Sequence, residues 1–228
     1  MRPPTVPAPE LRSLGPALEQ GAAVLGVALS PPQVECLLGY LELLGKWGRV
    51  YNLSALHEPQ QMLSHHLLDS LALVAPLRRH LAQRGLADAS LLDVGAGAGL
   101  PGVVVALCCP EVSVCCVDTV GKKAAFVRQV ALSLKLTGLR GVHARVEDLE
   151  QRFDIVTARA FASLADFTRC SDRALAPGGV WVAMKGRPPD DELAALPRAV
   201  EVFHVEQLLV PGLDAQRCLV WMRRRAAV

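Results

Sequence analysis

The chain reads LLDVGAGAGLPG over residues 91–102, and this stretch decides the fold. Residues 91–94 form a short apolar run around Asp93, which is typical of a parallel strand buried on both faces. Gly95, Gly97 and Gly99 follow at a spacing of two residues. Because glycine lacks a Cβ, the backbone can turn sharply here and approach a ligand closely. We therefore predict a strand that ends in a ligand-binding turn.

A helix is expected directly after this turn, over residues 103–108. Pro101 suits its first position, since the N–H that proline lacks is not needed there. Gly102 allows the helix to pack closely against the strand. The N-terminus of the helix points toward the turn, and this end of a helix favours a carboxylate or a phosphate.

The turn is compatible with two kinds of cofactor. Gly97, Gly99 and Gly102 form the pattern G-x-G-x-x-G, which is shared by dinucleotide sites and S-adenosylmethionine sites. An acidic residue two positions before Gly95 favours the second kind, because this arrangement resembles the first motif of class I methyltransferases. A strand-to-helix turn without any ligand is the remaining alternative.

Composition excludes several classes of protein. The 228 residues are 51% apolar, and 24 basic residues face 22 acidic ones, so any RNA contact must come from a local patch. The seven cysteines show no C-x-x-C spacing, which supports neither a zinc site nor a redox motif. No window approaches 18 uninterrupted apolar residues. We expect a cytoplasmic, monomeric protein with no membrane segment and with buried, reduced cysteines.

The first 85 residues are expected to form a small helical extension. Residues 1–12 are rich in proline and are expected to be flexible. One helix is predicted over residues 14–29, a second from Ser30 as N-cap to Gly48, and a third from Glu58 through Val74. We divide the chain into a flexible terminus (1–12), the helical extension (13–85) and the core (86–228).

The core alternates between strands and helices, which predicts a Rossmann-like α/β fold with a mostly parallel sheet and helices on both faces. Further strands are expected over residues 112–117, up to Glu147, over 153–157 and over 180–184. Helices are expected over 122–136 and over 164–175, the latter stopped by Pro177 and two glycines. Residues 200–210 and 217–222 alternate and predict a closing antiparallel pair.

Three polar positions are expected at the carboxyl ends of these strands, where ligands bind in open α/β sheets. Asp118 ends the second strand and can accept the two ribose hydroxyls of an adenosine, although a solvated loop position is the alternative. Glu147 lies where an adenine would fit, or else it only begins a helix. Arg159 follows the fourth strand and suits a carboxylate, a phosphate or a guanine edge, unless it is a plain surface residue.

Two absent motifs narrow the acceptor. No Asn-Pro-Pro-Tyr or Asp-Pro-Pro-Tyr follows the fourth strand, as would be expected for methylation of an exocyclic amine, and no Pro-Cys pair is present there to attack a pyrimidine. This favours an acceptor with a free lone pair and no proton to lose, such as guanine N7, for which a general base has no task. Catalysis would then depend on holding the methyl group in line with that nitrogen.

Taken together, these segments resemble the bacterial RsmG (GidB) family of small-subunit ribosomal RNA guanine-N7 methyltransferases. The matching segments cover roughly residues 41 to 212 and occur in family order: Lys46-Trp47, Tyr51-Asn52-Leu53, Met62-Leu63-x-x-His66-Leu67-Leu68-Asp69-Ser70, Asp93 to Gly102, Gly121-Lys122-Lys123, Arg128-Gln129-Val130, Arg145-Val146-Glu147, Arg159 to Leu164 and Lys185-Gly186.

The resemblance implies S-adenosyl-L-methionine as donor and a guanine in the decoding-region loop of 16S rRNA, free or in the small ribosomal subunit or its assembly intermediate, as acceptor. By matching positions, the cofactor contacts would be Gly95, Leu100, Val146, Glu147 and Arg159, with Gly97, Gly99 and Asp118 in the same cleft. Arg159 and Lys185 are the candidates for positioning the substrate. The candidates for RNA contact are Lys46, Arg49, His65, His66, Lys122, Lys123, Arg128, Lys185 and Arg187.

Some alternatives remain open. His65, His66 and Asp69 could suggest a metal, but adjacent histidines on a helix point about 100° apart, so no metal site is expected. A methyltransferase acting on another RNA or a small molecule would share the same motifs. An NAD(P)-dependent reductase would share the glycines, but the chain has no Tyr-x-x-x-Lys. A non-catalytic RNA-binding scaffold would not need an intact glycine turn.

Overall fold

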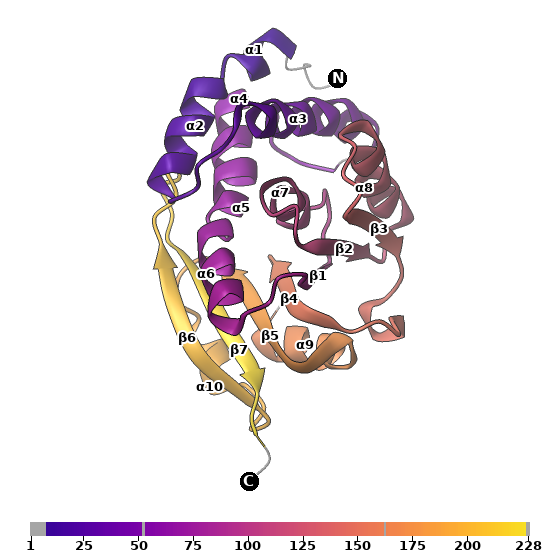
Figure 1. Ribbon diagram of the computed structural model, residues 1–228, viewed down its shortest axis with the longest axis vertical. Helices are drawn as coiled ribbons and strands as arrows, with labels where there is room; N and C mark the ends of the chain where they lie inside the picture. The colour runs from indigo at the N-terminus through magenta and orange to yellow at the C-terminus, as the bar shows by residue number, and fades with distance from the viewer. Residues whose placement is uncertain (1–7, 52, 162, 227–228) are drawn as a thin grey trace.

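The computed structural model describes residues 8–51, 53–161 and 163–226, and only the backbone of residues 8, 9, 49 and 50. Its strands are β1 (Ser90–Val94), β2 (Ser113–Asp118), β3 (Leu139–His143), β4 (Phe153–Arg159), β5 (Leu175–Lys185), β6 (Val200–Leu208) and β7 (Arg217–Arg224). They form one sheet in the order β3-β2-β1-β4-β5-β7-β6 (Figure 1). The first five are parallel, whereas β7 is antiparallel to both of its neighbours. The predicted Rossmann-like sheet and the closing antiparallel pair are confirmed.

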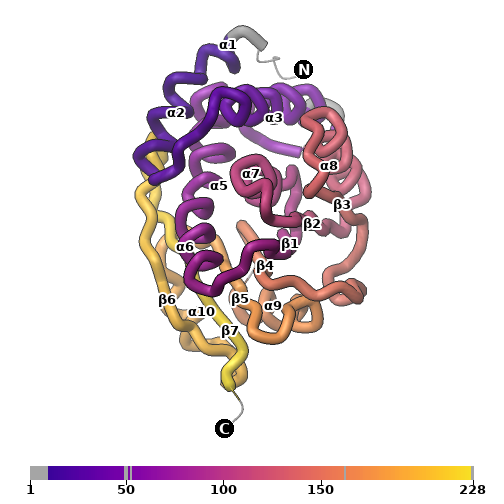
Figure 2. The backbone as a smooth tube through the Cα atoms, viewed as in Figure 1, coloured from indigo at the N-terminus to yellow at the C-terminus, as the bar shows by residue number. Residues whose placement is uncertain are grey.

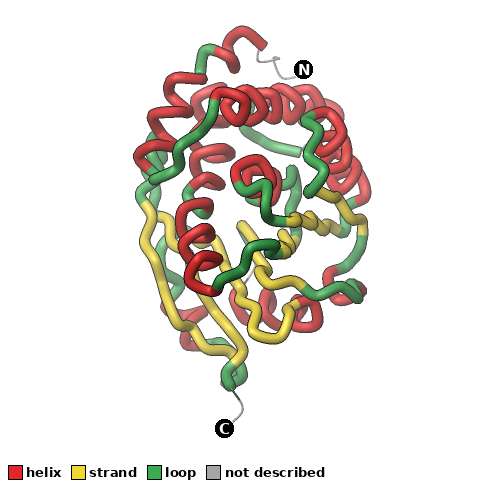
Figure 3. Tube along the Cα trace, viewed as in Figure 1, coloured by secondary structure: helices red, strands yellow, loops and turns green. Residues whose placement is uncertain are grey.

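Helices cover both faces of this sheet (Figures 1 and 3). The N-terminal ones are α1 (Ala8–Arg12), α2 (Gly15–Val24), α3 (Pro31–Tyr51), α4 (Pro59–Met62), the π-helical turn η1 (Leu63–Leu68), α5 (Asp69–Leu71) and α6 (Val74–Arg84). Those of the core are α7 (Gly102–Cys108), α8 (Gly121–Ser133), the 3-10 turn η2 (Val146–Asp148), α9 (Leu164–Ser171), the 3-10 turn η3 (Asp172–Ala174) and α10 (Asp190–Ala194).

The alternation of side chains along each strand divides the hydrophobic core into two layers. Leu91 belongs to a layer that the sheet shares with α7, α8 and the N-terminal helices. Leu92 points the other way, into a layer shared with α9 and η2. Both leucines are fully buried, which explains why β1 is almost continuously apolar.

The N-terminal helices differ in part from the prediction. Residues 8–12 are helical rather than loose, because Leu11 is buried against α3. The helix that begins at Glu58 is not continuous: it passes through a π-helical turn, is interrupted before Val74, and continues as α6, which was not predicted as a helix of its own. Figure 2 shows this helical layer in indigo and purple, with α2 lying beside one end of the β6–β7 pair.

Three predicted boundaries in the core are wrong. The helix from Leu164 ends at Ser171, and Leu175 already begins β5, since it pairs with Phe153 of β4 across a register shift. The third strand ends at His143, and Glu147 lies in a 3-10 turn instead. Pro101 takes the N-cap position rather than the first helical position of α7.

The candidate site lies at one edge of the sheet, the edge formed by the carboxyl ends of the parallel strands. The parallel strands β1, β2, β4 and β5 end at this edge, and the antiparallel β7 begins there, because Cys218 pairs with Lys185. Within the part of the chain that the structure describes, no helix has both the length and the apolar character needed to cross a bilayer.

Candidate active site

The glycine turn after β1 adopts the backbone that the sequence requires. Gly95, Gly97 and Gly99 have φ values of +66°, +59° and +84°, which L residues with a side chain rarely adopt. The N–H groups of Gly95 and Ala96 both donate to the carbonyl of Val117, which ties the turn to the end of β2. Gly95 is exposed, so the backbone at this point is open to a ligand.

A buried tyrosine of the N-terminal helix α3 is hydrogen-bonded to the glycine turn. Tyr40 of α3 is fully buried, and its hydroxyl donates to the carbonyl of Ala98 at 2.9 Å. Burial raises the pKa of this hydroxyl far above its usual range, so it remains a donor. The N–H of half-buried Ala98 has no acceptor within the described chain. The Ala98 amide is therefore free to donate to a ligand, while the Ala98 carbonyl is held by Tyr40.

Asp118 lies at the end of β2, as predicted, and is bound to the turn. One carboxylate oxygen accepts the N–H of Gly97 at 2.9 Å, and the other accepts the N–H of Val120 at 2.8 Å. The ammonium of Lys123 lies 3.6 Å away. Each oxygen keeps a second lone pair for a ribose hydroxyl. Asp118 thus shapes the turn itself, a contribution that the sequence did not reveal.

Asp93 is the buried anchor of α7. One of its oxygens accepts the N–H of Gly102 at 2.8 Å, and the other has no partner within the described chain. Burial raises the pKa of this carboxyl from 3.8 to about 7. Glycine is needed at position 102 because a Cβ there would clash with Cys116 Sγ and approach the Asp93 carboxylate.

Arg159, at the end of β4, belongs to a three-residue ion cluster. Its guanidinium donates to Asp69 Oδ2 at 3.1 Å and to the carbonyl of His65 at 2.8 Å. Arg217, the first residue of β7, donates to Asp69 Oδ1 at 2.8 Å. Asp69 is buried and comes from α5, so one carboxylate joins the N-terminal helices to the end of β4 and the start of β7.

A cavity of about 440 Å³ opens beside this cluster. Apolar side chains and charged groups line it together, and the ends of β4, β5 and β7 contribute to the lining. The lining residues are Leu56, His65, His66, Asp69, Arg159, Ala160, Met184, Lys185, Gly186 and Arg217. Arg159 and Ala160 of the lining lie at the end of β4, the strand next to β1, whose end leads into the glycine turn. We refer to it as the acceptor cavity.

The two histidines of the acceptor cavity make local hydrogen bonds. His65 Nδ1 lies 2.9 Å from Ser64 Oγ, and His66 Nε2 lies 2.8 Å from Ser54 Oγ. Burial, aided by Arg159, lowers the pKa of His66 from 6.5 to about 4. His66 is therefore neutral at pH 7 and offers no charge to a phosphate.

The remaining predicted residues are only partly brought together. Leu100 and Val146 are buried, so their side chains pack in the core, while the Glu147 side chain is half exposed beside Arg145. The N–H of Ala144 donates to the carbonyl of Asp118, which brings the η2 region to the same edge. Five RNA candidates lie outside the lining of the acceptor cavity, namely Lys46, Lys122, Lys123, Arg128 and Arg187. The Arg49 side chain lies outside the described residues.

Arg217 is a site residue that the sequence reasoning missed. It begins the last strand, which was predicted as part of an antiparallel pair. Because an antiparallel strand starts at the edge where its parallel neighbours end, the signal was available in the topology. Tyr40 and Glu192, which bonds to Lys185, carried no such signal.

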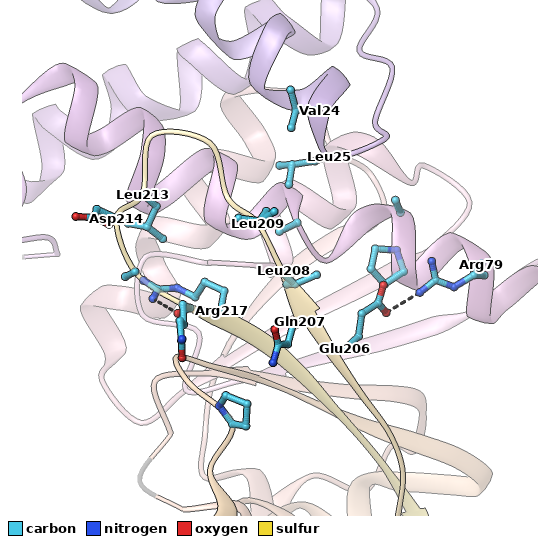
Figure 4. A pocket seen from close by; sticks show the side chains of 16 residues that line it. Val24, Leu25, Arg79, Glu206, Gln207, Leu208, Leu209, Leu213, Asp214 and Arg217 are labelled. Atoms are coloured by element: carbon cyan, nitrogen blue, oxygen red, sulfur yellow. Dashed lines mark hydrogen bonds and ion pairs between the residues drawn. The ribbon is translucent and has the colours of Figure 1, made fainter.

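A second cavity, of about 860 Å³, lies behind Arg217 between α2, α6 and the loop that joins β6 to β7 (Figure 4). Figure 4 shows Val24, Leu25, Leu208 and Leu209 on its apolar side, and the guanidinium of Arg79 is paired with Glu206 at 2.6 Å. Arg217 is paired with Asp69, and no lining residue of this cavity comes from β1, β4 or β5. We do not assign the reaction to this cavity.

Solved structures share the fold at low sequence identity. The structure of TrmN from Thermus thermophilus is 19% identical with a TM-score of 0.53, covering 72% of this chain and 53% of that chain. A SAM-dependent methyltransferase from Aquifex aeolicus is 16% identical with a TM-score of 0.53, covering 75% and 96%. These likenesses establish the Rossmann-like fold.

Sequence relatives are much closer. The ribosomal RNA small subunit methyltransferase G of Acidovorax sp. (strain JS42) is 63% identical over 212 residues, which cover 91% of this chain and 94% of that protein. The protein of the same name from Albidiferax ferrireducens is 58% identical over 223 residues, covering 95% and 100%. A model of the family described as rRNA small subunit methyltransferase G (GidB) matches residues 33–220. The chain therefore belongs to the GidB family of rRNA small subunit methyltransferases.

Proposed function

We propose that this protein transfers a methyl group from S-adenosyl-L-methionine to N7 of one guanine in the decoding-region loop of 16S rRNA. Family membership supports the coarser part of this statement, SAM-dependent methylation of rRNA. The atom, the base and the mechanism are our proposal. We further propose that it acts as a monomer in the cytoplasm, on the rRNA or on the small ribosomal subunit or its assembly intermediate.

One observation supports the proposal most directly: the glycine turn and the lining residues Arg159 and Ala160 lie at the carboxyl ends of two neighbouring strands. The turn follows β1, and Arg159 and Ala160 of the cavity follow β4, the strand beside it. At about 440 Å³ the cavity is in the range of small-molecule pockets, so it can take a single unstacked base. Two reactants would thus meet at the boundary between turn and cavity.

The residues of the turn suit this cofactor. Exposed Gly95 allows close approach, and the free N–H of Ala98 can donate to the methionine carboxylate. Asp118 keeps lone pairs for the ribose hydroxyls, and Val146 and Glu147 follow β3 on the same side. When bound, S-adenosylmethionine supplies a methyl group on a sulfonium, which needs no further activation. The assignment of individual contacts to Gly95, Gly97, Gly99, Leu100, Asp118, Val146, Glu147 and Arg159 remains a proposal.

The acceptor cavity suits a base whose reacting atom carries no proton. Both oxygens of Asp69 accept from guanidinium groups, so we assign this carboxylate to holding Arg159 and Arg217 rather than to proton removal. Guanine N7 needs no such removal, and the task of the protein is then to hold N7 in line with the methyl group. Arg159 and Arg217, fixed through Asp69, present their remaining N–H donors to the O6 edge or the phosphates of the RNA.

The proposal is tested by methyl transfer from labelled S-adenosylmethionine to 16S rRNA and to 30S particles from cells that lack this activity. Nucleoside analysis and chemical cleavage at 7-methylguanosine would locate the product. We expect label at N7 of one guanine. An Asp118→Ala variant should bind the cofactor more weakly, so at limiting cofactor its methyl transfer should be lower by about 10-fold or more. Label on another atom or another RNA would refute the specific proposal and leave the coarser assignment in place.

A further inference from the structure

The ammonium group of Lys185 is fully engaged inside the protein. It donates to Glu192 Oε1 at 2.9 Å, to Glu192 Oε2 at 2.8 Å and to the carbonyl of Phe161 at 3.4 Å. An ammonium has three N–H donors, so none remains for an RNA phosphate. Only 13% of the Lys185 side chain is exposed, which further separates it from solvent and from a large ligand.

Glu192 joins three segments of the chain. It lies on α10, binds Lys185 at the end of β5, and accepts the N–H of Leu164 at 2.7 Å. Leu164 is the first residue of α9, so the carboxylate also satisfies one of the unpaired N–H groups at the start of that helix. Its side chain is 29% exposed, which means that the pair is largely shielded from water.

The segment held in this way borders both the glycine turn and the acceptor cavity, because Arg159 and Ala160 line the cavity. It runs from Arg159 to Leu164, and within it Ala160 has a φ of +58°, a conformation that costs energy for a residue with a Cβ. The ring of Phe161 packs against Phe167 with a centroid distance of 5.6 Å. A Cβ added to Gly95 would lie 4.0 Å from the same ring, so Phe161 stands beside the glycine turn.

We propose that Glu192 is a positioning residue of the methyl-transfer reaction. It holds Lys185 on the carbonyl of Phe161, and the resulting clamp fixes the segment that borders both the glycine turn and the acceptor cavity. Lys185 acts through this clamp and not as a phosphate contact. The inference rests on the proposed function only in that the cavity takes the acceptor; the clamp itself is a property of the free protein.

The two roles of Lys185 predict opposite effects for a change at Glu192. If Lys185 binds RNA, removing its acidic partner frees a positive charge, so RNA affinity should rise and turnover should not fall. If the clamp is correct, removing Glu192 releases Phe161, and turnover should fall while RNA affinity stays the same. Small displacements of reacting groups can lower rates by about 100-fold, so we expect kcat to drop about 10- to 100-fold.

The test compares Glu192→Ala, Glu192→Gln, Lys185→Met and the double variant Lys185→Met/Glu192→Ala with the parent protein. Asp191→Asn is the matched control, because Asp191 is the adjacent carboxylate on α10, is exposed, and has no side-chain hydrogen bond within the described chain. The measurements are kcat and KM for 30S particles, the salt dependence of RNA binding, and hydrogen exchange of the peptide that contains Leu164.

The clamp predicts a lower kcat in Glu192→Ala and in Lys185→Met, with an unchanged KM and an unchanged salt dependence of RNA binding. The double variant should be no worse than Lys185→Met. Asp191→Asn should match the parent. Two results would overturn the inference in favour of a phosphate contact. One is tighter RNA binding with undiminished kcat in Glu192→Ala. The other is a slope of log binding constant against log salt concentration that is smaller by about 0.7 to 0.9 in Lys185→Met.

Hydrogen exchange keeps the inference testable apart from the proposed function. Faster exchange of the Leu164 amide in Glu192→Ala, with slower exchange retained in Glu192→Gln because its amide oxygen still accepts, supports the clamp whichever base is methylated. Exchange identical to that of the parent in both variants refutes it. A parent protein that methylates an atom other than guanine N7 would refute the proposed function alone.

Discussion

Replacing Asp69 by asparagine tests the cluster that joins the N-terminal helices to the active site. Asp69 is 5% exposed and accepts from Arg159 at 3.1 Å and from Arg217 at 2.8 Å. Asparagine keeps one acceptor oxygen but turns an amide nitrogen toward one of the two guanidinium groups. The variant therefore leaves two neighbouring cations without a counter-charge.

The magnitude follows from burial. Removing one partner of a fully buried ion pair costs about 3–5 kcal/mol. Both arginine side chains here are 23% exposed, so water partly compensates them, and one hydrogen bond survives. We expect a loss of about 2 kcal/mol in the free energy of unfolding, which for a chain of this size lowers Tm by about 4–8 °C. Turnover should fall by about 10-fold or more because Arg159 lines the acceptor cavity.

Urea denaturation and methylation of 30S particles would measure both effects. Asp172→Asn is the control, because Asp172 pairs with Arg224 on the surface, where the side chains are 54% and 39% exposed. Exposed pairs contribute about 0–1 kcal/mol, so this variant should unfold close to the parent and keep full activity. Equal unfolding free energies for the Asp69 and Asp172 variants would refute the reasoning that Asp69 neutralises a shielded cluster.

Three further predictions concern the turn and its surroundings. Tyr40→Phe leaves the carbonyl of Ala98 without its buried donor, at a cost of about 1–3 kcal/mol, and should raise the Kd for S-adenosylmethionine about 5-fold or more in calorimetric titration; an unchanged Kd would show that the turn keeps its shape alone. The pKa of His66 falls from 6.5 to about 4 on folding, so the unfolded chain binds a proton first and stability should decline from pH 6.5 to pH 4; His66→Gln should flatten that slope in urea titrations, and a parallel slope would contradict the assignment. Gly102→Ala should destabilise the fold by about 1–3 kcal/mol through a clash with Cys116, and adding Cys116→Ala should recover part of the loss in thermal unfolding, which a clash elsewhere would not allow.

Local patterns predicted the parts of the protein that depend on neighbours in sequence. The turn at Gly95 to Gly99 was predicted because positive φ values select glycine wherever the residue lies. Glu58 was predicted to begin a helix, and its carboxylate accepts from the N–H groups of Gln60 and Gln61. Asp118 was placed correctly at the end of β2, because buried strands can be recognised in the sequence as short apolar runs.

Predictions failed where a distant segment decided the outcome. Leu175 was predicted to end the helix that begins at Leu164, yet it begins β5 because Phe153 of β4 provides its strand partner. Lys185 is a second position that depends on distant segments: its ammonium bonds to Glu192 and to the carbonyl of Phe161, and its RNA contact stays a prediction. No pattern along the chain identifies such partners.

The sequence by itself determined the Rossmann-like class, the glycine turn and the family, because strand periodicity, glycine geometry and motif spacing act over a few residues. Only the tertiary structure decided which charges are free to act. Tyr40 reaches Ala98 across 58 residues, and Arg217 reaches Asp69 across 148. Whether a charged side chain binds RNA or holds the fold depends on the acceptors that packing brings to it, and packing is set by the whole core rather than by the adjacent sequence.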